Sequence, residues 1–160
     1  MTWDAPRVAA LEASLLAAGM TVATCESLTG GLVISALVEP AGASAVVRGS
    51  IVAYATDVKS SLVGVDLALL ASQGAVNAEV ATQMARGARE LLGASIGVAT
   101  TGVAGPDVQD GAPVGTVFVA VSTPQGERCE GAHFVGDRDE IRRAACDLAL
   151  ELIANSVPRE

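Results

Sequence analysis

The segment TCESLTGG, residues 24–31, gathers a carboxylate, hydroxyl groups and two glycines between two apolar runs. A helix that begins near Thr29 would leave the backbone N–H groups of Thr29, Gly30 and Gly31 unpaired, and such groups can receive an anion or a developing oxyanion. The two glycines would leave room for a ligand. Ser27 is therefore a candidate nucleophile. The alternative is that Ser27 or Thr29 merely caps the helix.

Lys59 is the only lysine in the chain, beside nine arginines, and Tyr54 is the only tyrosine. Arginine stays protonated, whereas a buried lysine can lose its proton and act as a base. Its pKa would have to fall from about 10.4 to roughly 7 or 8. Ser27 and Lys59 would then form a nucleophile–base pair without histidine. A surface lysine is the alternative. The single histidine, His133, falls in a predicted strand, which disfavours a Ser-His-Asp triad.

A second polar turn, TTGVAGP at residues 100–106, also follows an apolar run. It offers backbone N–H and hydroxyl groups to a ligand, but its spacing matches neither a Rossmann fingerprint nor a P-loop. Nearer the C-terminus, Arg142 and Arg143 are candidates for holding a phosphate. Solvated surface arginines are the alternative for this pair.

Composition disfavours several classes of protein. The net charge is −8 and no basic stripe interrupts it, so a nucleic-acid partner is not expected. No apolar run reaches the roughly 20 residues of a membrane span, and no signal peptide is present, which predicts a soluble cytoplasmic protein without a membrane partner. Cys25, Cys129 and Cys146 form no metal-binding pattern, so we expect reduced thiols and no metal.

Periodicity and turn residues predict the elements that must position these groups. Gly49 predicts an irregularity in the second strand, and Asn77 is the expected N-cap of the fifth helix. Thr56 or Asp57 is expected to cap the third helix. The predicted helices cover 5–18, 29–39, 57–64, 66–74, 78–93 and 137–156, and the predicted strands cover 20–26, 45–56, 95–102, 116–123 and 126–136.

This alternation predicts an α/β fold: one three-layer α/β/α domain over residues 1–160, with a mixed parallel and antiparallel central sheet. The length fits one domain, and aromatic residues at 2% leave Ala, Val, Leu and Ile to build the core. Ligands of open α/β sheets lie beyond the carboxyl ends of strands. Two junctions have that character, the polar turns in CESLTGG and TTGVAGP.

The chain resembles the family of the C-terminal domain of the competence/damage-inducible protein CinA. The resemblance runs through TCESLTGG, GSIVAYATDVKSSLVGV, GAVNAEVATQMARGARE, GVATTGVAGP, PVGTVFVAV and GDRDEIRRAA. It implies hydrolysis of the carboxamide of nicotinamide mononucleotide to nicotinate mononucleotide and ammonia, in pyridine nucleotide (NAD) salvage. It also implies a homo-oligomer that uses neither a metal nor a cofactor.

The same resemblance implies roles for individual residues. Ser27 is similar to the family's nucleophile, Lys59 to its base and Tyr54 to a third catalytic group. The acidic stretch DVQDGA replaces a glycine-rich run, and Asp107 and Asp110 would repel a phosphate if they faced the pocket. A different amide substrate therefore stays open, as does a non-catalytic module that binds a phosphorylated metabolite. The implied contacts to the substrate or its oxyanion are Glu26, Thr29, Gly30, Gly31, Ser50, Thr101, Gly102, Ala104, Gly105 and Arg142.

Overall fold

The computed structural model of the protein describes residues 2–158. Within these residues, no helix is both long and apolar enough to cross a membrane. The predicted order of helices and strands is confirmed. The elements are α1 (Ala5–Ala17), β1 (Val22–Glu26), α2 (Leu32–Val38), the 3-10 helix η1 (Ala43–Ala45), β2 (Val47–Val52), α3 (Thr56–Val63), α4 (Leu67–Gln73), α5 (Ala78–Leu91), β3 (Ile96–Gly102), β4 (Thr116–Thr123), β5 (Gly126–His133) and α6 (Arg138–Ser156).

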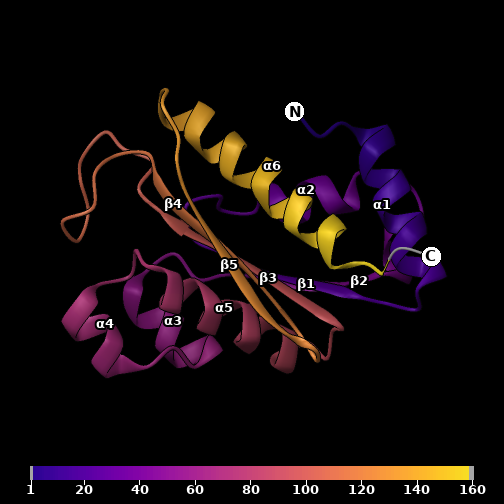
Figure 1. The fold of residues 1–160 in the computed structure, drawn as a ribbon, viewed down its shortest axis with the longest axis horizontal. Helices are drawn as coiled ribbons and strands as arrows, with labels where there is room; N and C mark the ends of the chain where they lie inside the picture. Colours follow the sequence, from indigo (N-terminus) through magenta and orange to yellow (C-terminus); the bar gives the residue numbers. More distant parts are fainter. Residues whose placement is uncertain (1, 159–160) are drawn as a thin grey trace.

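The five strands form one sheet in the order β2-β1-β3-β4-β5. β1 runs parallel to both β2 and β3, whereas the β3–β4 and β4–β5 pairs are antiparallel. Figure 1 shows α1, α2 and α6 over one face of the sheet and α3, α4 and α5 over the other. The fold is therefore the predicted three-layer α/β/α domain with a mixed sheet.

The face of the sheet under α5 is lined by small residues. Cys25, Ala99 and Ala120 are buried there against apolar residues of α5 and α3. A side chain at Gly97 would place its Cβ 2.0 Å from the carbonyl oxygen of Ala85, which shows that α5 lies directly on β3. Gly87 of α5 likewise faces a backbone carbonyl at the end of α3. This close packing holds α3, the helix that carries Lys59, near the carboxyl end of β1.

Several predicted details of the elements are confirmed. Asn77 caps α5 by accepting from the N–H of Val80 at 2.9 Å. The pairing of β1 with β2 shifts register between Val22 and Ala23, where Ala23 lies opposite Gly49. In each case a local signal, a capping side chain or a glycine, determined the result.

One predicted helix start and one predicted helix cap are wrong. α2 begins at Leu32, not near Thr29, because Gly30 (φ 57°) and Gly31 (φ 101°) adopt left-handed backbone conformations that a helix does not continue. α3 begins after Ala55, which provides no side-chain cap, so neither Thr56 nor Asp57 caps it. The polar segment after β1 is therefore a turn of its own, not the first turn of a helix.

Candidate active site

Ser27 lies in the turn that follows β1, beside the end of β3. Its backbone N–H donates to the carbonyl oxygen of Thr100 at 3.0 Å. β1 and β3 are parallel neighbours, and Glu26, the last residue of β1, pairs with Thr100, near the end of β3 at Gly102. The two polar turns that the sequence singled out therefore meet at the carboxyl edge of the sheet.

Lys59 projects from α3 to this same point. Its side chain is buried, with 1% of its surface exposed, and Nζ lies 3.0 Å from Oγ of Ser27. Nζ also donates to the carbonyl oxygens of Ala53 at 2.8 Å and Tyr54 at 3.1 Å. Burial lowers the pKa of Lys59 below its usual 10.5, although nearby Cys25 and Asp110 oppose this shift. The structure thus brings the predicted nucleophile and base into contact.

The surroundings of Nζ suit a neutral amine as well as an ammonium ion. A neutral amine has two N–H donors and one lone pair. The carbonyls of Ala53 and Tyr54 can take both donors, since carbonyl oxygens only accept. The lone pair is then left for the hydroxyl proton of Ser27. This arrangement can remove a proton from the serine as it attacks.

Glu26 binds the backbone of the turn and of the start of α2. Its carboxylate is buried and accepts from the N–H groups of Gly31 (3.0 Å), Val33 (3.0 Å) and Ile34 (2.8 Å). The N–H of Gly30 donates to the carbonyl of Ser27 at 3.1 Å. The expectation that Gly30 and Gly31 offer unpaired N–H groups is therefore wrong, because both groups are already bonded.

The guanidinium of Arg142 reaches the same turn from α6. Nε donates to the carbonyl of Leu28 at 2.9 Å, and Nη2 donates to the carbonyl of Thr29 at 3.0 Å. Arg143 is exposed and pairs with Asp139 at 2.7 Å. Neither arginine lines the cleft next to Ser27.

That cleft has a volume of ≈ 290 Å³, close to the lower end of small-molecule sites, at roughly 300 Å³. Arg138 forms one wall: Nη1 donates to the carbonyl of Gly105 at 2.6 Å, and Nη2 donates to Oη of Tyr54 at 3.2 Å. Tyr54 is 60% exposed and reaches Lys59 only through its backbone carbonyl. The lining residues are Ser27, Leu28, Tyr54, Ala55, Thr56, Gly102, Val103, Ala104, Gly105, Asp107, Gln109 and Arg138.

Arg138 is absent from the residues that the sequence singled out. A signal was available, because a basic side chain at the first position of a helix opposes the preference of the helix dipole for acids there. Asp139 and Glu140, which follow it, obey that preference. An arginine in this position therefore indicates a contact outside the helix.

Three predicted hydroxyl residues lie in the framework around the cleft instead of lining it. Oγ of Ser50 is 2.6 Å from Oγ1 of Thr24, whose hydroxyl donates to Glu26. Thr101 donates to the carbonyl of Ala75 at 2.7 Å. Oγ1 of Thr29 and Oγ1 of Thr100 are 2.8 Å apart. Gly102, Ala104 and Gly105 do line the cleft.

Of the remaining polar residues that the sequence singled out, one lines the cleft and two do not. Asp107 lines the cleft, whereas the carboxylate of Asp110 accepts from the N–H of Ala75 at 2.9 Å. His133 is exposed on β5, outside the cleft. Over residues 2–158, no cluster of three or more His, Cys, Asp or Glu side chains is arranged to hold a metal ion.

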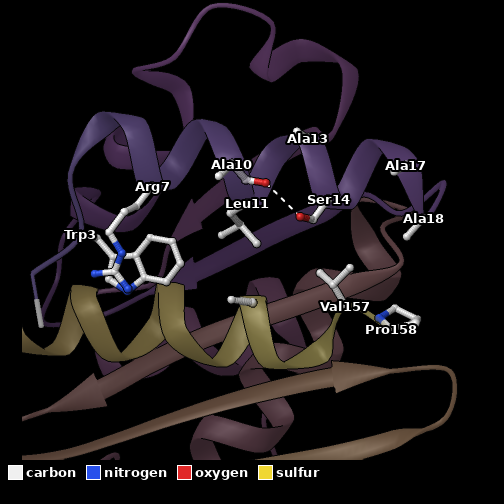
Figure 2. A pocket seen from close by; sticks show the side chains of 11 residues that line it. Trp3, Arg7, Ala10, Leu11, Ala13, Ser14, Ala17, Ala18, Val157 and Pro158 are labelled. Carbon is white, nitrogen blue, oxygen red and sulfur yellow. Dashed lines mark hydrogen bonds between the residues drawn. The ribbon is translucent and has the colours of Figure 1, made fainter. Parts of the chain in front are cut away.

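A larger groove, of ≈ 990 Å³, lies between α1 and the end of α6 (Figure 2). Arg7 stacks over the ring of Trp3 there, 4.3 Å from its centroid. The hydroxyl of Ser14 donates to the carbonyl of Ala10 within α1. No base faces this serine among the lining residues, so the smaller cleft at Ser27 is the candidate active site.

The comparisons with known proteins agree in one family. A family model described as the CinA C-terminal domain matches residues 5–157. A CinA-like protein of Frankia casuarinae is 49% identical over 133 residues, which are 83% of this chain and 31% of that protein. A CinA-like protein of Anaeromyxobacter dehalogenans is 47% identical over 142 residues, 88% of this chain and 35% of that protein. The chain thus spans about a third of the length of these curated relatives.

Solved structures give the same result. The crystal structure of the competence/damage inducible protein CihA from Agrobacterium tumefaciens has a TM-score of 0.87 and 35% identity, and covers 98% of this chain and 99% of that one. The CinA superfamily protein ECK1530/EC0983 from Escherichia coli has a TM-score of 0.90 and 30% identity, over 95% and 90% of the two chains. The matched fold and sequence show that this chain belongs to the CinA C-terminal domain family.

Proposed function

We propose that the protein hydrolyses the carboxamide of nicotinamide mononucleotide to nicotinate mononucleotide and ammonia. The observation that carries this proposal is the contact of 3.0 Å between Nζ of the buried Lys59 and Oγ of Ser27. We place the reaction in cytoplasmic pyridine nucleotide salvage, carried out by a homo-oligomer without metal or cofactor. The match to the CinA family supports the assignment at the level of the family.

The reaction divides into two steps. In the first, Lys59 takes the hydroxyl proton of Ser27 as Oγ attacks the amide carbon, and a tetrahedral oxyanion forms. Protonated Lys59 then returns the proton to the amide nitrogen, the C–N bond breaks, and ammonia leaves an ester on Ser27. In the second step Lys59 takes a proton from water as the water oxygen attacks the ester carbon. The bond from that carbon to Oγ then breaks, Lys59 returns the proton to Oγ of Ser27, and nicotinate mononucleotide leaves.

Backbone N–H groups next to Ser27 are suited to stabilise the oxyanion. Those of Leu28, Ala104 and Gly105 belong to residues that line the cleft, and they have no hydrogen-bond partner within the described chain. Each donor of this kind lowers the barrier by roughly 3 kcal/mol. We therefore assign the oxyanion to the turn after Ser27 and the turn after β3, in place of Gly30 and Gly31.

Arg138 and Tyr54 would contact the rest of the substrate. Two of the five N–H donors of Arg138 are used, on Gly105 and Tyr54, so the others can meet a phosphate. Because Oη of Tyr54 accepts from Arg138, its own proton is free to donate into the cleft. We retain Tyr54 as the third catalytic group, which relays the proton from Lys59 to the departing nitrogen.

A second candidate is an amidohydrolase of the same chemistry that acts on an amide without a phosphate. The observation that favours it is the carboxylate of Asp107 in the lining of the cleft, which would repel an anionic group. Comparing nicotinamide mononucleotide with nicotinamide riboside, which lacks the phosphate, separates the two candidates. Faster turnover of the riboside would favour the second.

The direct test is ammonia release from nicotinamide mononucleotide by the purified protein. We expect release by the wild type and by Arg143→Ala, an exposed control on α6. Ser27→Ala and Lys59→Ala, once shown to be folded, should lose at least about 10³-fold in kcat, as removal of a nucleophile or its base does. Saturable binding of the nucleotide without turnover by the wild type would instead indicate a non-catalytic binding module.

A further inference from the structure

Arg142 spans two consecutive carbonyl groups of the turn that carries the nucleophile. Its Nε bonds Leu28 and its Nη2 bonds Thr29, at 2.9 Å and 3.0 Å. The planar guanidinium fixes both carbonyls at once, which a lysine ammonium does not reproduce. The guanidinium also packs against the turn at Gly30, where a Cβ would lie in ordinary van der Waals contact, 3.5 Å from Nη2 of Arg142.

Because each peptide unit is planar, fixing the carbonyl of Thr29 also determines the orientation of the carbonyl of Ser27. In a trans peptide the C=O and the N–H point in opposite directions. When Arg142 fixes the carbonyl of Thr29, it also fixes the N–H of Gly30, which donates to the carbonyl of Ser27 at 3.1 Å. That carbonyl shares a peptide plane with the N–H of Leu28. The direction of the Leu28 N–H, next to the nucleophile, thus depends on Arg142.

Glu26 holds the same segment through its backbone N–H groups. Its carboxylate takes N–H groups at Gly31 and beyond, while Arg142 takes carbonyl groups at Leu28 and Thr29. The two charged groups act on the backbone of one short segment with opposite polarity. Only its start, at Ser27 and Leu28, lines the cleft.

We propose that Arg142 is a positioning residue that orients the Leu28 N–H as an oxyanion donor, and that it does not bind the substrate. This inference rests on the proposed amide hydrolysis at Ser27. It differs from the substrate contact that the family resemblance implies for Arg142. The two roles predict different kinetic changes. Loss of an oriented oxyanion donor lowers kcat, because the donor acts in the transition state, whereas loss of a substrate contact raises KM.

The test compares Arg142→Lys and Arg142→Gln with Arg143→Lys, the matched control on the exposed side of α6. Removal of an oxyanion donor lowers kcat by about 10²- to 10³-fold. We expect Arg142→Lys, which keeps the charge but loses the fork, to lower kcat for nicotinamide mononucleotide by about 10- to 100-fold. KM should stay within about twofold, and Arg143→Lys should match the wild type. Assays run well below the melting temperature of each variant, so that loss of fold does not enter.

A second readout does not need the nucleotide. An alkyl fluorophosphonate is attacked at phosphorus by Oγ of Ser27, fluoride leaves, and the serine proton passes through Lys59 to solvent. The adduct is measured by intact mass, with Ser27→Ala as the blank. We expect labelling of Arg142→Lys to slow in parallel with its kcat, while Arg143→Lys labels at the wild-type rate.

The outcomes separate the two proposals. A raised KM with unchanged kcat, or wild-type values for both in Arg142→Lys and Arg142→Gln, would overturn the positioning role. If the wild type labels but does not hydrolyse the nucleotide, the proposed substrate is wrong, and the labelling rates alone decide the role of Arg142. If the wild type neither hydrolyses nor labels, Ser27 is not an activated nucleophile and the positioning role is overturned as well.

Discussion

At the scale of single residues, the chemistry depends on the protonation of Lys59. Its surroundings contain three acceptors within hydrogen-bond distance and no carboxylate among them. Burial disfavours the charged amine, so the folded state lowers the pKa. A lysine in this setting can reach its neutral, basic form closer to physiological pH than an exposed one. The lowered pKa also makes the free energy of unfolding depend on pH, and this dependence can be measured without any substrate.

We expect the free energy of unfolding of the wild type to rise with pH relative to that of Lys59→Met. Between the lowered pKa of the folded state and 10.5, unfolded Lys59 binds a proton that folded Lys59 does not. Deprotonation therefore favours the folded state, by at most about 1.4 kcal/mol per pH unit. The contribution of Lys59 deprotonation to the free energy of unfolding is fully present above pH 10.5. It is lost as the pH falls through the lowered pKa of Lys59 in the folded state. Urea unfolding of both proteins across this range provides the measurement.

The comparison with Lys59→Met removes contributions that both proteins share. Burial raises the pKa of Cys25 to about 12, so its thiol stays protonated in the folded state across this window. Its titration in the unfolded state occurs in both proteins and cancels. Parallel curves for wild type and variant would show that the pKa of Lys59 is not lowered by folding, and would remove the support for a neutral base.

At the scale of elements, the turn between β1 and α2 is held by buried polar contacts. Glu26 accepts from Gly31 and Val33 through one oxygen and from Ile34 through the other. Glu26→Gln replaces one acceptor by an N–H₂ group and leaves buried donors unpaired, so it should reduce the free energy of unfolding by about 1–3 kcal/mol. Denaturant unfolding at pH 7 measures this loss.

Glu12 in α1 is the matched control. It is also buried, at 7% exposure, but its Oε1 has no hydrogen-bond partner in the described chain, and burial raises its pKa. Burial therefore disfavours its charged form, and Glu12→Gln should leave stability at pH 7 unchanged or increase it. An equal loss in both variants would mean that the hydrogen bonds of Glu26 contribute nothing beyond the burial of a carboxylate.

Local signals predicted the elements, while contacts between them decided the site. Ser27 and Lys59 could be chosen from the sequence because a polar turn after a strand and a solitary lysine are both unusual. The roles of Arg138 and Arg142 could not, since they depend on which side of α6 meets the cleft and which meets the turn. The start of α2 was missed because Gly30 and Gly31 bend the chain where a capping pattern predicts a helix.

At the scale of the whole molecule, the charge of −8 opposes the approach of an anionic substrate. Positive charge that could offset this repulsion is local to the cleft. Arg138 and Asp107 are the charged side chains that line it, and Lys59 contacts Ser27. The proposed site must therefore capture its substrate against a repulsive field. Such a field acts over a range set by ionic strength, roughly 30 Å at 0.01 M and 10 Å at 0.1 M salt.

Raising the salt concentration from 0.01 M to 0.1 M should therefore change kcat/KM in opposite directions for two substrates. The phosphate of nicotinamide mononucleotide carries roughly −1.5 to −2 at pH 7 and outweighs the positive ring, so screening the repulsion should increase its kcat/KM a few-fold. Nicotinamide riboside keeps only the positive ring, and its kcat/KM should fall. Initial rates at low substrate concentration give both values, with Arg143→Gln as a control for unspecific changes of surface charge. Reversed signs, a fall for the mononucleotide and a rise for the riboside, would show that the local positive charge of Arg138 outweighs the field of the whole chain at the mouth of the cleft.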